Sequence, residues 1–396
     1  MTSQRGVRIR TDYTLLLGIV MLVTIGLIMV YSATFVLRDD PAYYLKRQAM
    51  WAGLGLMAML FLARLDYHVW RRAALPALGL SLLLLLAVLL VGGNETGAQS
   101  WFLAGSIQPS EFAKLGFVVY IAAWLASKGE RIRDVTYGLI PFAILLGLVA
   151  GLILLQPDLG TAAVLVMTAL SVFFIAGAEL TQLLVSLLVG GLTLYAMILN
   201  SGYAQRRLQE FLNPGADPQG VSYQVQGIIA AVRAGGIAGR GLGAGSFKLF
   251  PPFLHHTDTI FSVIGEELGL VGCLIVVGLF LVVAYRGLAV AFRAPDSFGS
   301  LLSFGVTAWI VFQAIMHVGA NTGALPFTGI TLPFISYGGS SLTMLLAAAG
   351  LLLSVSGAGR EKEVRTSATY AFGWRYRRPR LSRTGSRRRA AKRYSR

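Results

Sequence analysis

Long apolar runs separated by short polar segments make up the chain from residue 13 to residue 356. Many of these runs approach the ~20 residues that an α-helix needs to cross a bilayer. The pattern therefore predicts an all-α polytopic membrane domain of about ten transmembrane helices. The predicted spans are residues 13–31, 50–63, 74–91, 112–126, 137–155, 161–176, 180–199, 261–284, 301–317 and 340–355.

Composition agrees with this class. Hydrophobic residues make up 55% of the 396 positions, charged residues only 13%, and mean hydropathy is +0.67. A soluble protein of this length would need more charge to cover its surface. The single cysteine, Cys273, lies inside the eighth span, so no intramolecular disulfide is possible and we expect it to pack within the bundle.

Basic residues in the short loops predict the orientation, because cytoplasmic loops carry an excess of Lys and Arg. The loops at residues 93–109, 156–160 and 318–339 contain neither Lys nor Arg, whereas the alternate loops are basic. We therefore expect residues 1–12 and the C-terminus to be cytoplasmic, and one long loop, at residues 200–257, to lie outside. Arg38, Lys46 and Arg47, in the first outer loop, are the exception.

Residues 357–396 form a strongly basic tail. From residue 360 onward, fourteen Lys and Arg residues stand against Glu361 and Glu363, a net of +12 within the total of +16. We expect this tail to be disordered and drawn to anionic membrane lipid, at about 1 kcal/mol per basic residue near the surface. No folded recognition module accompanies it, so we expect no nucleic-acid partner.

The long loop contains an amphipathic piece at residues 224–232 and a glycine-rich stretch at residues 235–243. Glycine-rich patterns can hold phosphates, but neither a strand–turn–helix context nor a Walker lysine is present, so we reject nucleotide binding. Close backbone approach, flexibility and a re-entrant turn all explain the glycines.

Charged residues near the predicted helix starts are the first chemical candidates. Pro109 and Ser110 can begin a helix, with Ser110 as N-cap and Glu111 in the first turn, where the helix dipole favours an anion. Lys114 lies three residues further on the same face and can pair with Glu111, either as a local ion pair or as a site for phosphate. Asp158 follows the fifth span and fits an N-cap of the next helix.

Asp258 is the strongest catalytic candidate. A carboxylate at membrane depth is costly and is a functional-site hypothesis by default. Burial would raise its pKa toward neutral and make it a usable general base. With a helix starting near Thr257, Glu266 would lie roughly 12 Å deeper. The alternative is an N-cap aspartate, with Glu266 and Glu267 paired to arginines elsewhere. Adjacent histidines, at positions 255 and 256, lack the usual spacing of zinc ligands.

The segment at residues 323–341 breaks the helical pattern with two prolines, several glycines and hydroxyl side chains. Non-helical backbone at membrane depth must line a cavity or be buried in protein. Ser340 and Ser341 close this segment.

Five motifs in order resemble the SEDS family (shape, elongation, division and sporulation), whose members include FtsW, RodA and SpoVE. They are QPSEFAK at 108–114, QPDLGT at 156–161, HTD at 256–258, EELG at 266–269 and LPFISYGGSS at 332–341. The resemblance implies ten transmembrane helices and a peptidoglycan glycosyltransferase that polymerises lipid II on the outer face of the bacterial cytoplasmic membrane. It further implies a class B penicillin-binding protein as transpeptidase partner, together with other divisome proteins.

The same resemblance places the family's catalytic aspartate at Asp258 and its cavity-lining charged pair at Glu111 and Lys114. Residues 330–333 look closer to the division and sporulation branches than to the elongation branch. Thr259 and His317 depart from the residues common in the family. The expected substrate-binding set is Lys114, Glu111, Arg240, Asp158, Ser340 and Ser341, supported by Glu266, Glu267, His256 and Thr257.

The leading hypothesis is thus a division-type lipid II polymerase at the septum. It would use undecaprenyl-pyrophosphate-linked glycan as donor and Asp258 as general base, with inversion. A divalent cation, Mg²⁺ or Mn²⁺, could neutralise the pyrophosphate, although the sequence offers no clear ligand set. Other hypotheses are a lipid II flippase, since broken helices and intramembrane charge also suit transporters, an elongation-type polymerase and a scaffold for divisome partners.

Overall fold

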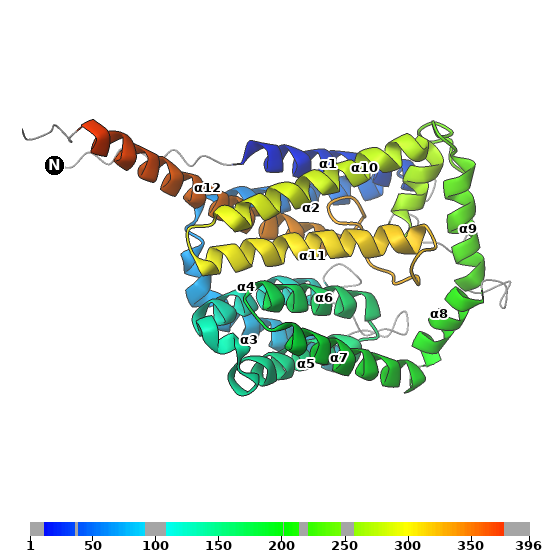
Figure 1. Cartoon of the computed structure of the whole chain (residues 1–396). Coiled ribbons are helices and arrows are strands. Elements are labelled where there is room, and N and C mark those ends of the chain that lie inside the picture. The colour runs from blue at the N-terminus through cyan, green and yellow to red at the C-terminus, as the bar shows by residue number, and fades with distance from the viewer. Residues whose placement is uncertain are drawn as a thin grey trace, which may run out of the picture.

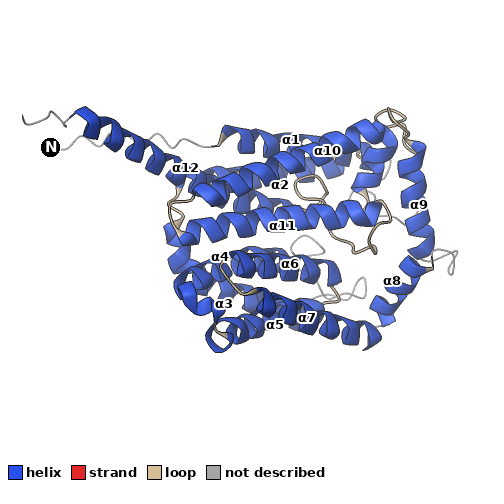
Figure 2. Ribbon diagram, in the orientation of Figure 1, coloured by secondary structure: helices blue, strands red, loops and turns tan. Residues whose placement is uncertain are grey.

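The computed structural model describes residues 12–35, 39–91, 108–200, 202–213, 221–246 and 257–375. Within these ranges the regular structure is helical and no strand occurs (Figure 2). The helices are α1 (Tyr13–Thr34), α2 (Tyr43–Arg64), α3 (His68–Val91), α4 (Pro109–Lys128), the 3₁₀-helix η1 (Gly129–Arg133), the π-helix η2 (Val135–Leu139), α5 (Ile140–Leu154), α6 (Leu159–Ile175), α7 (Leu180–Asn200), α8 (Gly202–Leu212), α9 (Val221–Ala234), α10 (Ile260–Arg293), α11 (Ser297–Asn321) and α12 (Gly339–Arg375).

Each of the ten predicted spans falls on a helix, namely α1 to α7 and α10 to α12, with η2 extending the fifth. By length and composition, seven of the described helical stretches can cross a membrane. The chain is therefore an all-α polytopic membrane protein, and the count of ten crossings stays a prediction. In the long predicted loop, the amphipathic piece at 224–232 lies within α9, while α8 was not predicted.

The long helices lie side by side, and the shorter α8 and α9 stand across one end of the bundle (Figure 1). The start of α1 and the free end of α12 both point toward the opposite end (Figure 1). The first and last helices of the described bundle thus have their outer ends on one side, and the cytoplasmic location of that side stays a prediction.

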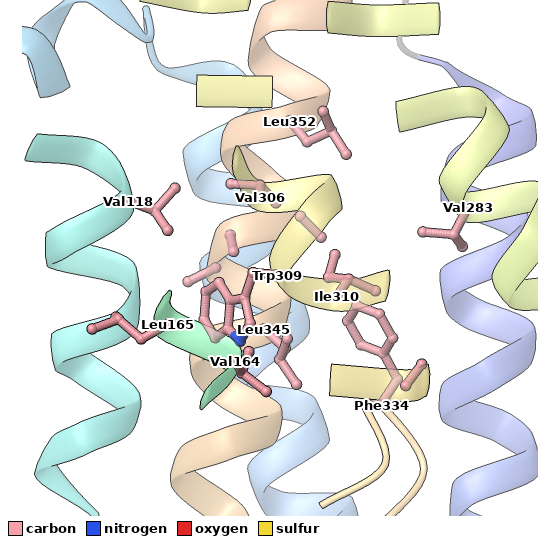
Figure 3. Close-up of a cluster of buried hydrophobic side chains, with 14 of the residues drawn as sticks. Val118, Val164, Leu165, Val283, Val306, Trp309, Ile310, Phe334, Leu345 and Leu352 are labelled. Atoms are coloured by element: carbon pink, nitrogen blue, oxygen red, sulfur yellow. The ribbon is translucent and has the colours of Figure 1, made fainter. Parts of the chain in front are cut away.

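Apolar side chains from several helices meet in the centre of the bundle. Val118 of α4, Val164 and Leu165 of α6, and Trp309 of α11 belong to this cluster (Figure 3). Small residues let the helices approach. A methyl group on Gly287 of α10 would sit 2.2 Å from Oγ1 of Thr307 on α11. In a bilayer, where the hydrophobic effect does not drive helices together, such close van der Waals packing stabilises their association.

Two local predictions of helix starts were wrong. Helix α4 begins at Pro109 with Gln108 as N-cap, so Ser110 lies inside the first turn. Proline suits this first position because it lacks the N–H that would be unpaired there. Helix α10 begins at Ile260 rather than near Thr257. Helix α12 continues to Arg375, and the disorder of the tail stays a prediction.

The eighth span is also interrupted. Gly269 has φ 67° and ψ −164°, which breaks the helical path of α10. Carbonyl groups before the break find partners in the glycine-rich segment 235–246. The carbonyl of Glu266 accepts from the backbone N–H of Arg240, and that of Glu267 from Gly241, both at 3.0 Å.

The N–H groups after the break are also paired. Leu270 donates to the carbonyl of Gly236 at 2.9 Å, and Val271 to that of Ile237 at 3.2 Å. A methyl group on Gly239 would lie 2.2 Å from the carbonyl oxygen of Glu267. Of the three explanations for the glycines, close backbone approach is therefore the one realised here.

Candidate functional site

The segment 322–338, between α11 and α12, is the scaffold of the site. Phe334 adopts φ 66°, which is rare for a residue with a side chain, and its ring is buried in the core (Figure 3). The hydroxyl of Ser336 accepts from the N–H of Leu332 at 2.8 Å and donates to the carbonyl of Thr257 at 2.7 Å. The second half of the segment, residues 330–336, is mostly buried, whereas its first half is partly exposed, so the prediction of burial holds only for the second half. The segment also holds the backbone just before α10.

Asp258 lies next to this segment. The side-chain amide of Asn321, at the end of α11, donates to the carbonyl oxygen of Asp258 at 3.0 Å. Gly329 is so near that a methyl group there would be 3.5 Å from Oδ2 of Asp258. The N-cap of α10 is Thr259, whose side chain makes no capping bond. The alternative interpretation of Asp258 as an N-cap is therefore wrong.

The surroundings of Asp258 change its acidity. Although the residue keeps part of its surface accessible, enough protein surrounds the carboxyl group that burial raises the pKa of Asp258 to about 7. The positive charge of Arg207 and a hydrogen bond from Thr257 act in the opposite direction, and Asp158 adds to the rise. A carboxylate with this pKa can accept a proton near neutral pH.

Glu111 and Lys114 form the predicted pair. The ammonium group of Lys114 lies 2.8 Å from Oε1 of Glu111 and donates to Oε1 of Gln313, on α11, at 2.9 Å. It also lies 5.2 Å from the ring centroid of Trp309. Both members of the pair are buried, so low polarity strengthens their attraction. Oε2 of Glu111 has no hydrogen-bond partner among the described residues.

Asp158, in the loop between α5 and α6, contacts the start of α4 and, through it, the start of α12. Its Oδ1 accepts from the N–H of Thr161 at 3.0 Å, so the predicted N-cap is confirmed. Its Oδ2 accepts from the side chain of Gln108 at 3.0 Å, and the backbone N–H of Gln108 donates to Oγ of Ser340 at 3.2 Å. Asp158 is thus both a cap and a neighbour of Asp258, whose pKa it raises.

Ser341 extends this network to α11. Its hydroxyl lies 3.0 Å from the hydroxyl of Thr331. The side-chain amide of Gln313 donates to the carbonyl of Thr331 at 3.0 Å, while its Oε1 accepts from Lys114. The segment 322–338 therefore connects Ser341 to Lys114 through Thr331 and Gln313, and it lies beside Asp258. Asp158 is joined to Ser340 through Gln108.

Glu266, Glu267 and Arg240 form a second cluster, at the break in α10. Oε1 of Glu266 lies 3.1 Å from Nη1 of Arg240 and accepts from the N–H of Ser246 at 2.8 Å. A carboxylate oxygen of Glu267 accepts from the N–H of Gly243 at 3.1 Å. The alternative in which Glu266 pairs with an arginine is confirmed. These glutamates hold the glycine-rich segment against the break, two turns along α10 from Asp258. His256 lies outside the described residues.

Sequence reasoning missed four residues of the site. Gln313, His317 and Asn321 recur every four residues along one face of α11, and Nδ1 of His317 bonds to the carbonyl of Ile330 at 2.8 Å. Polar side chains at this spacing in an apolar span were the available signal. Arg207 on α8 gave no comparable signal, since an arginine on an amphipathic helix ordinarily faces water.

A metal site is not assigned. Within the described part of the chain, no group of three or more His, Cys, Asp or Glu side chains is arranged to hold a metal ion.

Known proteins resemble this chain along most of its length. A family model described as "Cell cycle protein", which covers FtsW, RodA and SpoVE, matches residues 13–361. The chain belongs to this family. The resemblance of the five motifs is thereby confirmed across almost the whole described bundle.

Named relatives of this family are similar along most of their length. A protein of Trichlorobacter lovleyi named "Probable peptidoglycan glycosyltransferase FtsW" is 40% identical over 353 residues, covering 87% of this chain and 93% of that protein. "Stage V sporulation protein E" of Bacillus subtilis is 40% identical over 356 residues, covering 87% and 96%.

Solved structures of the family share the fold. A chain from the study "Structural coordination of polymerization and crosslinking by a peptidoglycan synthase complex" aligns with a TM-score of 0.76 and 34% identity, over 88% of this chain and 98% of that one. The rod shape determining protein RodA of Thermus thermophilus aligns with a TM-score of 0.66 and 32% identity, over 88% and 97%.

Proposed function

We propose that this protein is a peptidoglycan glycosyltransferase that polymerises lipid II on the outer face of the bacterial cytoplasmic membrane. The observation that carries the proposal is Asp258, a carboxylate with a pKa of about 7 held by Asn321 and the segment 322–338. The names of the relatives point to the same activity. Those named FtsW favour a role in cell division at the septum.

Asp258 would accept one proton in the reaction. The 4-hydroxyl of the incoming lipid II sugar attacks the anomeric carbon of the lipid-linked glycan, and its proton passes to the Asp258 carboxylate. The bond from that carbon to the undecaprenyl pyrophosphate breaks, and the pyrophosphate leaves with the bonding electrons. One displacement inverts the anomeric centre and gives a β-1,4 link.

Buried polar groups of the candidate site would bind and orient the substrate. Oε2 of Glu111 and Nε2 of His317 are buried without hydrogen-bond partners among the described residues. Buried polar atoms are normally satisfied, so such atoms are expected to meet a bound molecule. Lys114 and the serines at 340 and 341 complete this proposed surface, with Glu266 and Glu267 in support through the α10 break.

A class B penicillin-binding protein is the proposed partner, because polymerisation and crosslinking are coordinated in the complex that the structural relative comes from. The partner, the remaining divisome proteins and the lipid substrate are all proposals for this chain.

The test is polymerisation of lipid II by purified protein, with and without its cognate transpeptidase. We expect the wild type to make glycan chains and Asp258→Asn to make none, although both proteins are equally well folded. Asp134→Asn is a matched control, since Asp134 is an exposed N-cap beside the π-helix η2. If the wild type makes no glycan even with the partner, while lipid II crosses proteoliposome membranes, the protein is a flippase instead.

A further inference from the structure

Arg207 connects the amphipathic helix α8 to the site. Its Nη1 donates to the carbonyl of Phe327 at 2.5 Å, and its guanidinium carbon lies 5.2 Å from the centroid of the Phe327 ring. Its charge also acts directly on the Asp258 carboxyl group. Helix α8 thus brings a cation to Asp258 from the end of the bundle where α8 and α9 stand (Figure 1).

The other two candidate cations, Lys114 and Arg240, each already have a carboxylate partner. Lys114 is neutralised by Glu111 and also bonds to Gln313, with only 3% of its side chain exposed. Arg240 pairs with Glu266 in the second cluster. A pyrophosphate group that leaves next to two carboxylates, Asp258 and Asp158, needs a further positive charge.

We propose that Arg207 binds the diphosphate of the lipid-linked donor during the transfer reaction. A guanidinium group is planar, remains charged and matches two phosphate oxygens with parallel N–H donors. The ring of Phe327 and the carbonyl of the same residue hold this plane in a fixed orientation. In an inverting displacement, base and leaving group flank one carbon, so a cation within electrostatic reach of Asp258 is well placed for the leaving group.

This inference rests on the proposed polymerase function and names the residue that would hold its leaving group. The test compares the wild type with Arg207→Gln, Arg207→Lys and Arg233→Gln. Arg233 is an exposed arginine in the last turn of the neighbouring helix α9, and serves as the matched control. Lipid II polymerisation is measured with undecaprenyl diphosphate or undecaprenyl monophosphate as inhibitor, and thermal unfolding of each variant is recorded.

For Arg207→Gln, we expect inhibition by undecaprenyl diphosphate to weaken about 10- to 100-fold, as for loss of a charge-assisted contact. Inhibition by the monophosphate should weaken less, because it lacks the second phosphate group. Arg207→Lys should recover part of the loss, since it keeps the charge but not the paired donors. Arg233→Gln should behave as the wild type.

Two results would overturn the inference. One is unchanged inhibition of Arg207→Gln by undecaprenyl diphosphate. The other is an equal loss for both lipids, which would mean that Arg207 only shapes the segment at Phe327. If the wild type makes no glycan, the proposed function fails separately. Thermal stabilisation of the protein by undecaprenyl diphosphate, absent in Arg207→Gln, would then still support the arginine site.

Discussion

The ammonium group of Lys114 lies 2.8 Å from Oε1 of Glu111, with 3% and 5% of the two side chains exposed. Removing one member of such a pair leaves an uncompensated charge in the bundle. We expect Glu111→Gln or Lys114→Met alone to lower the free energy of unfolding by about 3–5 kcal/mol. The double variant should lose less than the sum of the single variants, because neither charge is then left alone.

Thermal and denaturant unfolding in detergent, arranged as a double-mutant cycle, would measure this coupling. Lys46, exposed and paired with Asp40 at 2.9 Å, offers a control. Lys46→Met should change stability by no more than about 1 kcal/mol, as for surface ion pairs. Additive effects at 111 and 114 would contradict the buried pair.

Replacing Asp258 by Asn should slow catalysis strongly without harming the fold. General-base catalysis contributes about 10²- to 10⁴-fold, so the rate of glycan synthesis should drop by that amount. Stability should not fall, because a carboxyl group whose charged form is disfavoured by burial is replaced by a neutral amide of the same shape. Steady-state polymerisation and the melting temperature, measured on one preparation, check both parts.

The activity should depend on pH through Asp258. Its pKa is raised from 3.8 to about 7, and only the deprotonated form accepts the proton. The rate should therefore rise as the pH increases through about 7 and then level off. Arg207 favours the charged carboxylate and Asp158 disfavours it. Arg207→Gln should thus move the rise to higher pH, and Asp158→Asn to lower pH.

The same shift has a consequence for stability. The folded protein holds a proton on Asp258 that the unfolded chain releases above its ordinary pKa of 3.8. This contribution makes the folded state more stable as the pH falls from about 7 toward about 4. The free energy of unfolding of the wild type and of Asp258→Asn can be measured at several pH values. If the difference between the two proteins does not change across this range, the pKa of Asp258 is not raised.

The glycine-rich segment offers a steric prediction. Gly236 and Gly239 both have left-handed φ values, of 54° and 78°, but only a methyl group at Gly239 meets the carbonyl of Glu267, at 2.2 Å. Gly236→Ala should cost about 1–2 kcal/mol from backbone conformation alone. Gly239→Ala should cost about 1–3 kcal/mol more, because the break in α10 must shift. Parallel unfolding curves of the two variants would test the difference.

Short-range patterns determined much of this protein. Apolar runs located every long helix of the bundle, because a helix that crosses a bilayer needs about 20 predominantly apolar residues. Spacing of three residues predicted the pair of Glu111 and Lys114, and the residue order around Asp158 predicted its cap. The five motifs identified the family. Each of these features depends on neighbours in sequence.

Tertiary structure decided what no local pattern encodes. Gly269 looks like any glycine in an apolar run, and only the backbone of the segment 235–246 turns it into a break in α10. Gln313 reaches Lys114 across 199 residues of sequence. Arg207 meets the neighbourhood of Asp258 only through the fold of the segment 322–338. The burial of Asp258 and the charges around it come from residues that are distant in sequence. Its acidity therefore depends on tertiary packing, which no local sequence pattern encodes.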